Sequence, residues 1–190
     1  MSVFEHLIAL GSFILALGIA SILVGIATLV HRRAEARLSA AQLMWMAAIF
    51  LELINFWLGA YNYRNVREAS YVTISFVVIY PTLLFLQAAL VAPEQGQPPD
   101  LVANHQRNHR YYAGLAAVCG ALGVGFFLWA NSAINPVPAP VIALPALQGS
   151  IALAAAIISA RWLQTSAAAL LVLLGVANFV GATWMLVHLA

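Results

Sequence analysis

Six apolar stretches, each long enough to cross a bilayer, constrain this chain more than any other feature of its sequence. A membrane-spanning helix needs about 20 mostly apolar residues. The stretches that meet this requirement lie at roughly 4–30, 39–61, 70–92, 111–132, 141–160 and 166–188. They predict an all-α protein, a polytopic membrane helix bundle of six transmembrane helices, with residues 1–190 forming a single transmembrane domain.

The composition agrees with lipid as the main solvent of the chain. Hydrophobic residues make up 64% of it and charged residues only 7%, whereas soluble domains average about 45–50% and about 25%. The lipid bilayer is therefore the expected partner. A net charge of +2 is too small to indicate nucleic-acid binding. The first stretch is not expected to be a cleaved signal peptide, because its positive charge follows the apolar run.

The arginines predict an orientation in the membrane. Six of the eight basic residues, all of them arginine, fall in loops on one side: Arg32, Arg33, Arg37, Arg107, Arg110 and Arg161. Short loops rich in arginine usually stay in the cytoplasm. We therefore expect a multi-pass protein of a bacterial inner membrane with both termini on the non-cytoplasmic side. Arg107 and Arg110 are expected to meet anionic lipid headgroups.

The longest predicted loop, residues 93–108, has the character of a linker. Its prolines and glycine end the third span, and we expect the whole segment to stay irregular. It allows an arrangement of three spans plus three spans. No clear sequence repeat relates the two halves, so an inverted-repeat transporter has no support from the sequence.

A carboxyl group lies near the middle of the second span. A charged side chain at the bilayer centre costs about 2.5–3.5 kcal/mol on insertion scales, so Glu52 is expected to face protein or water. Asn55, Gly59 and Asn62 follow at three- and four-residue steps, which places them with Glu52 on one helix face. By the predicted orientation this face leads to the outer surface. The residues expected at its outer mouth are Arg64, Arg67 and Glu68.

Glu52 has a functional and a structural interpretation. In the first, it lines a polar pocket or half-channel open to the outside, where it binds a proton or a cation. In the second, it hydrogen-bonds to a neighbouring helix and fixes the bundle. Its candidate partners are Thr73, Tyr80, Gln87, Gln148 and Asn178. The predicted binding site comprises Glu52, Asn55, Asn62, Tyr80 and Asn178, and no metal site is expected.

The leading hypothesis for function is a small transporter or channel-like protein for protons, small cations or solutes, acting as an oligomer or a narrow half-channel. The first alternative is a non-catalytic accessory or scaffold subunit of a larger membrane complex. The second is a haem- or quinone-binding electron carrier. The histidines, however, lie near the ends of spans or in a loop, and membrane haem ligands usually lie deeper: His6, His31, His105, His109 and His188. No other cofactor is expected, and the absence of hydrolase and phosphate-binding motifs points away from an enzyme.

Three runs in the middle of the chain carry a resemblance. They are FWLGAYNYRNV at 56–66, YPTLLFLQAALVAPE at 80–94 and HRYYAG at 109–114. In its aromatic pair on the second span, its proline in the third and its basic–aromatic start to the fourth, the chain resembles uncharacterised small bacterial multi-span integral membrane proteins. The resemblance covers roughly the middle third of the chain. It implies a membrane location and brings no activity with it.

Overall fold

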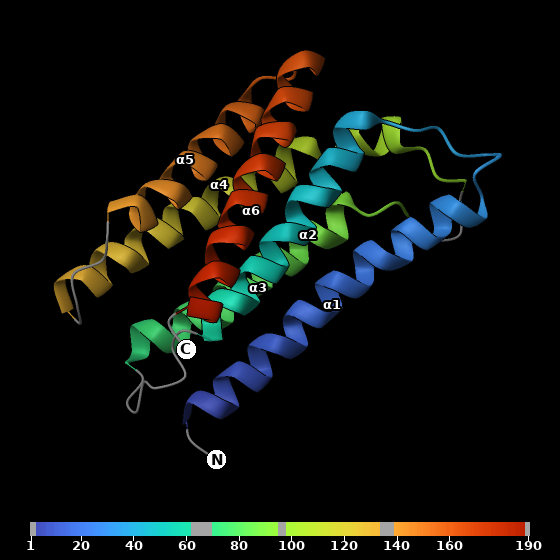
Figure 1. The fold of residues 1–190 in the computed structure, drawn as a ribbon. Helices are drawn as coiled ribbons and strands as arrows, with labels where there is room; N and C mark the ends of the chain where they lie inside the picture. Colours follow the sequence, from blue (N-terminus) through green and yellow to red (C-terminus); the bar gives the residue numbers. More distant parts are fainter. Residues whose placement is uncertain (1–2, 62–69, 95–97, 134–138, 189–190) are drawn as a thin grey trace.

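The computed structural model describes residues 3–61, 70–94, 98–133 and 139–188, and these residues form an all-helical bundle (Figure 1). The helices are α1 (Val3–His31), α2 (Ala40–Tyr61), α3 (Tyr71–Val91), α4 (Leu101–Ala133), α5 (Ala139–Ile157) and α6 (Arg161–His188). Most of the described residues are helical, and they contain no strand. The predicted fold class, an all-α bundle of six helices, is confirmed.

The lengths and apolar character of the helices match a membrane. Five of them, α1, α2, α3, α4 and α6, are long and apolar enough to cross a bilayer. The apolar part of α5, Val141–Ile157, is shorter. The chain is therefore a membrane-embedded helical protein, and its fifth predicted span falls just short of the usual spanning length.

The start of α4 differs from the prediction. The helix begins at Leu101 and not near residue 111, so the expectation that 93–108 stays irregular was wrong for 101–108. The physical reason is a helix cap, because the side chain of Asp100 accepts a hydrogen bond of 2.9 Å from the backbone N–H of Ala103. The two prolines that precede this aspartate lie outside the helix.

Five of the six helices close into a ring, and α1 packs against the outside of it (Figure 1). Around the ring, α2 contacts α3, α3 contacts α4, α4 contacts α5, α5 contacts α6, and α6 returns to α2. α1 lies against α2 and α3. It comes close through small residues: a Cβ atom on Gly25 would lie 2.7 Å from the ring of Pro93. The arrangement of three spans plus three spans stays a prediction.

Successive helices run in opposite directions, so α1 begins and α6 ends at the same end of the bundle (Figure 1). We call the other end, where α2, α4 and α6 begin, the arginine-rich end. There the loop after α1 joins the segment before α4. Backbone hydrogen bonds link Arg37 to Pro99 and to Leu101, and the Arg37 guanidinium lies 3.0 Å from the carboxylate of Asp100.

Candidate functional site

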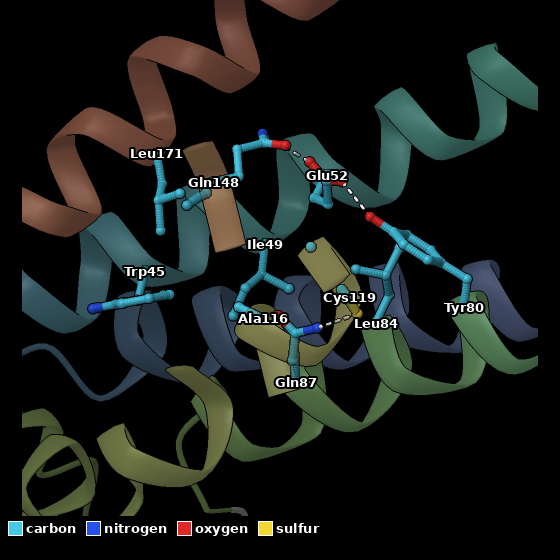
Figure 2. Close-up of a pocket in the computed structure, with 12 residues that line it drawn as sticks. Trp45, Ile49, Glu52, Tyr80, Leu84, Gln87, Ala116, Cys119, Gln148 and Leu171 are labelled. Carbon is cyan, nitrogen blue, oxygen red and sulfur yellow. Dashed lines mark hydrogen bonds between the residues drawn. The ribbon is translucent and has the colours of Figure 1, made fainter. Parts of the chain in front are cut away.

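A small cavity lies inside the ring, and all five ring helices contribute to its wall (Figure 2). Its volume is about 40 Å³, and because a water molecule needs about 10–15 Å³ of such space, the cavity has room for a few waters. Its polar wall consists of Glu52 from α2, Tyr80 and Gln87 from α3, Cys119 from α4 and Gln148 from α5. The rest of the wall is mainly apolar and includes Leu171 of α6.

Glu52 is half-buried and has neighbours on two other helices (Figure 2). The hydroxyl of Tyr80 donates a hydrogen bond of 2.9 Å to Oε1 of the carboxyl group. The side-chain amide of Gln148 donates to Oε2 at 3.5 Å, the outer limit of hydrogen-bond distance. Two of the five candidate partners named from the sequence therefore contact Glu52. The longer of the two contacts leaves Oε2 the less firmly held oxygen.

The partners of Glu52 suit both charge states of its carboxyl group. A carboxylate can accept the O–H of Tyr80 and an N–H of Gln148 at the same time. A carboxylic acid with its proton on Oε2 can donate it to the carbonyl oxygen of the Gln148 amide, after a half-turn of that amide. Neither charge state leaves an unpaired group in the apolar interior, where such a group would be costly.

The close crossing of α4 and α5 positions two residues of the cavity wall. A Cβ atom on Gly120 would lie 2.4 Å from Cα of Gly149 and 2.7 Å from the carbonyl oxygen of Pro145. The backbones of α4 and α5 can meet here only because both positions lack a side chain. Their immediate neighbours, Cys119 and Gln148, both line the cavity. The glycine pair therefore sets how closely α5, which carries Gln148, lies against α4.

A second polar contact lies in the cavity wall, on the side toward the arginine-rich end. The buried amide of Gln87 donates a hydrogen bond of 3.3 Å to Sγ of Cys119 (Figure 2). The sequence offered a signal for Gln87, which lies seven residues after Tyr80 and so on the same face of α3. It offered none for Cys119.

The two predicted site residues on α2 point to different helices. The side chain of Asn55 is buried, and its amide donates a hydrogen bond of 2.9 Å to the backbone carbonyl of Gly175 in α6. It does not line the cavity. Asn178, also on α6, is half-buried, and no hydrogen bond joins it to Glu52 in the described part of the chain. Asn55 thus serves the contact between α2 and α6.

The expected outer mouth lies outside the described residues. Four predicted residues fall in that segment, and their roles stay predictions: Asn62, Arg64, Arg67 and Glu68. On the same side of Glu52, the described helices hold a cluster of rings that we call the aromatic layer: Phe56, Phe76, Tyr80 and Phe126. Phe56 stacks on Tyr80 with ring centroids 5.0 Å apart, and Phe76 stacks on Phe126 at 4.1 Å.

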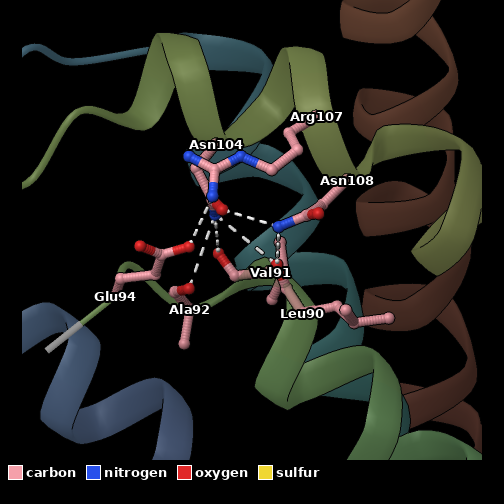
Figure 3. Close-up of polar contacts among 7 residues, drawn as sticks. All are labelled: Leu90, Val91, Ala92, Glu94, Asn104, Arg107 and Asn108. Atoms are coloured by element: carbon pink, nitrogen blue, oxygen red, sulfur yellow. Dashed lines mark hydrogen bonds and ion pairs between the residues drawn. The ribbon is translucent and has the colours of Figure 1, made fainter.

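The arginine-rich end holds its helices by polar contacts (Figure 3). The side-chain amide of Asn104 lies 3.4–3.5 Å from three backbone carbonyls at the end of α3, those of Leu90, Val91 and Ala92. These carbonyls have no partner within the helix, so the amide caps it. Of the two arginines predicted to meet lipid headgroups, Arg107 forms an ion pair of 2.7 Å with Glu94. Arg110 is exposed.

Two of the five histidines lie together on one helix. The rings of His105 and His109, one turn apart on α4, have centroids 5.4 Å apart. Axial ligands of a membrane haem come from facing helices, and these two do not. The described residues contain no group of three His, Cys, Asp or Glu side chains that could hold a metal ion.

Comparison of the chain with protein families, with curated proteins and with solved structures gives no match. The class of protein therefore follows from its own fold and site. It is a polytopic helical membrane protein whose second helix carries a carboxyl group beside a small polar cavity.

Proposed function

We propose that this protein is a small membrane transporter or channel-like protein that moves protons through a site centred on Glu52. One observation carries the proposal. Glu52 is the only acidic side chain in the membrane spans that the structure describes, and it lies in the wall of a cavity inside the ring together with the polar groups of Tyr80, Gln87 and Gln148. An ionisable group at this depth usually marks a pathway for ions or protons.

The chemistry of the cavity favours a proton over a metal cation. Hard cations are bound by six or so oxygen ligands, usually carboxylates and carbonyls. Here the groups nearest to Glu52, the Tyr80 hydroxyl and the Gln148 amide, present hydrogen-bond donors to it. A volume of about 40 Å³ is also too small for a cation with a full hydration shell. A small protic solute that exchanges hydrogen bonds with Glu52 is the remaining variant of the proposal.

The pathway in this proposal lies within one chain. The cavity is lined by five helices of the same molecule, which favours a narrow half-channel in each copy over a wide pore shared by an oligomer. The proposal places the protein in a bacterial inner membrane with the arginine-rich end in the cytoplasm. The distribution of arginines in the sequence supports this orientation.

Proton flux into liposomes tests the proposal. Purified protein is reconstituted with a pH-sensitive dye inside the vesicles, and a potassium gradient with valinomycin drives proton entry. We expect flux above that of protein-free vesicles, and we expect Glu52→Gln to reduce it to the protein-free level. Glu94→Gln is the matched control, because Glu94 is exposed and lies outside the spans.

Two outcomes would contradict different parts of the proposal. Equal proton flux in wild type and Glu52→Gln would remove Glu52 from the pathway. No flux of protons, monovalent cations or small protic solutes in the wild type would remove transport itself. Stable co-purification of another membrane protein in that case would favour an accessory subunit.

A further inference from the structure

We infer that the cavity is entered from the arginine-rich end, through an aromatic constriction formed by Trp45 and Tyr112, and that this constriction limits what reaches Glu52. This entry route concerns the same site as the proposed function and rests on that function. It reverses the direction that the sequence pattern predicted, since that pattern led from Glu52 toward the outer surface.

The constriction lies at one end of the cavity. Trp45 lines the cavity and precedes Glu52 by seven residues on α2, which is about 10 Å toward the arginine-rich end. Its ring centroid lies 5.1 Å from that of Tyr112 on α4, with the two rings tilted by 56°. The exposed fractions are 1% for Trp45 and 0% for Tyr112. The two rings therefore stand between the cavity and that end of the bundle.

One of the two rings is fixed by a hydrogen bond. The hydroxyl of Tyr112 pairs with Nδ1 of His105, which lies two turns earlier on α4 and is half-buried. The ring of His109 lies 5.4 Å from that of His105. Polar, proton-exchanging groups thus continue from Tyr112 toward the arginine-rich end.

The other ring is held by packing alone. The indole N–H of Trp45 is buried and has no hydrogen-bond partner in the described part of the chain. A buried tryptophan usually finds a partner for this group. In Figure 2 the indole nitrogen lies on the side of the ring away from the cavity. A turn of the Trp45 ring would therefore break no hydrogen bond, whereas movement of the Tyr112 ring would break the one to His105.

The route inward from the constriction carries polar groups. His105, Tyr112 and Cys119 recur at seven-residue steps, so they share one face of α4. Cys119 and its hydrogen-bonded partner Gln87 lie in the cavity wall with Glu52. A proton that passes Trp45 therefore enters a cavity with room for water and with polar groups in its wall.

In the opposite direction, the described residues place the aromatic layer beyond Glu52. There the rings of the aromatic layer come from α2, α3 and α4, and neighbouring rings in it have centroids 4.1–6.0 Å apart. That side is therefore lined by several rings in contact with one another, whereas the arginine-rich side has a single ring pair.

Sided labelling of Cys119 tests the inference. Cys119 is the one cysteine of the chain, and it lies in the cavity wall. Silver ion, which is small, charged and thiol-reactive, is applied in chloride-free buffer to either face of reconstituted vesicles, and the mass of the protein after treatment with N-ethylmaleimide in denaturant reports which thiols had reacted. Glu35→Cys in a Cys119→Ser background shows which face carries the arginine-rich end. Cys119→Ser alone supplies the blank.

We expect slow labelling of wild type from both faces. Trp45→Ala should raise the rate by about tenfold or more from the arginine-rich face only, since thiol reactivity follows access. Trp45→Phe, which keeps an apolar ring and the fold, should raise it less. Phe76→Ala in the aromatic layer should not raise the rate from the opposite face. Tyr112→Phe should raise it modestly from the arginine-rich face, because it frees the second ring from His105.

Two results would overturn the inference. One is faster labelling from the opposite face in any Trp45 variant. The other is an unchanged rate in both Trp45→Phe and Trp45→Ala, where gel filtration shows that each is folded. The measurement needs no transported substrate. Sided labelling without proton flux would therefore support the constriction and contradict the proposed function.

Discussion

The aromatic rings at the two ends of the cavity are held in different ways. On the side away from the arginines, the aromatic layer joins three helices through stacked rings. On the arginine-rich side, two tilted rings are followed by histidine and asparagine side chains that hydrogen-bond to neighbouring groups. One end is held by contacts among four rings, and the other by a single ring pair in which Tyr112 is hydrogen-bonded to His105 and Trp45 has no hydrogen bond in the described part of the chain.

The membrane explains why ring packing matters so much in the aromatic layer. Lipid tails are as apolar as the rings, so burial away from lipid gains little, and close contact between helices provides the stabilisation. Offset and tilted aromatic pairs add about 0.5–1.5 kcal/mol beyond their buried area. The aromatic layer therefore acts as the fixed end of the site in this account, and the arginine-rich end acts as the end that opens.

The largest expected effect comes from breaking the aromatic layer. Phe126→Ala removes the stacked partner of Phe76, and a buried Phe→Ala change costs about 3–5 kcal/mol. Thermal unfolding in detergent should show this as a clear fall in melting temperature. Leu128→Ala, on the same helix with 53% of its side chain exposed, should change it little. Equal melting temperatures for the two variants would show that the aromatic layer does not hold the helices together.

The next largest effect is expected at the crossing of α4 and α5, which lies between the two ends of the cavity. Gly120→Ala places a methyl group where the structure has the backbone of α5, and such overpacking costs about 1–3 kcal/mol. It should also reduce proton flux, because Gln148 moves away from Glu52. At Gly125 a Cβ atom would meet nothing within 4 Å, so Gly125→Ala should be neutral or up to about 1 kcal/mol more stable. The reverse order of stabilities would contradict the close approach of α4 and α5.

A smaller effect is expected where the aromatic layer meets the site. Tyr80→Phe keeps the ring that stacks on Phe56 but removes the hydrogen bond to Glu52. We expect a loss of about 0.5–1.5 kcal/mol in the free energy of unfolding, together with slower proton flux. Tyr111→Phe is the matched control, because 65% of that side chain is exposed. Slower flux in the control as well would mean that the hydroxyl of Tyr80 has no special role.

The smallest effect concerns the cap at the arginine-rich end. The pKa of Asp100 is lowered, because its charged form accepts the backbone N–H of Ala103 and lies beside Arg37. Its contribution to stability is therefore fully present above the ordinary carboxyl pKa of about 3.9, and is lost as the pH falls through the lower folded-state value. Melting temperatures of wild type and Asp100→Asn should differ slightly at neutral pH and converge in acid. A constant difference across this range would contradict the assignment.

The sequence was sufficient for the fold because the signal for each helix is local. Long apolar runs separated by short polar segments predicted all six helices. The start of α4 was missed because it depends on one capping contact of Asp100, and a polar first turn resembles a loop. Tyr80 and Gln148 were among the candidate partners of Glu52, since few polar side chains lie at its depth.

The sequence was not sufficient to show which helix each face meets. Glu52 and Asn55 are three residues apart and so differ by only about 60° around α2. Because α2 lies between α3 and α6 in the ring, this small angle is enough to send the two side chains to different neighbours. Trp45 and Tyr112 carried no signal, since aromatic residues near the ends of spans are common as interface anchors.

The most direct test of the account is infrared spectroscopy of the Glu52 carboxyl group in reconstituted protein. Its C=O band is assigned by comparison with Glu52→Gln. The account predicts a band that shifts on exchange into D₂O and changes with the pH of the solution at the arginine-rich end. A band that neither exchanges nor responds to pH on either side would contradict it, because Glu52 would then be a closed structural contact.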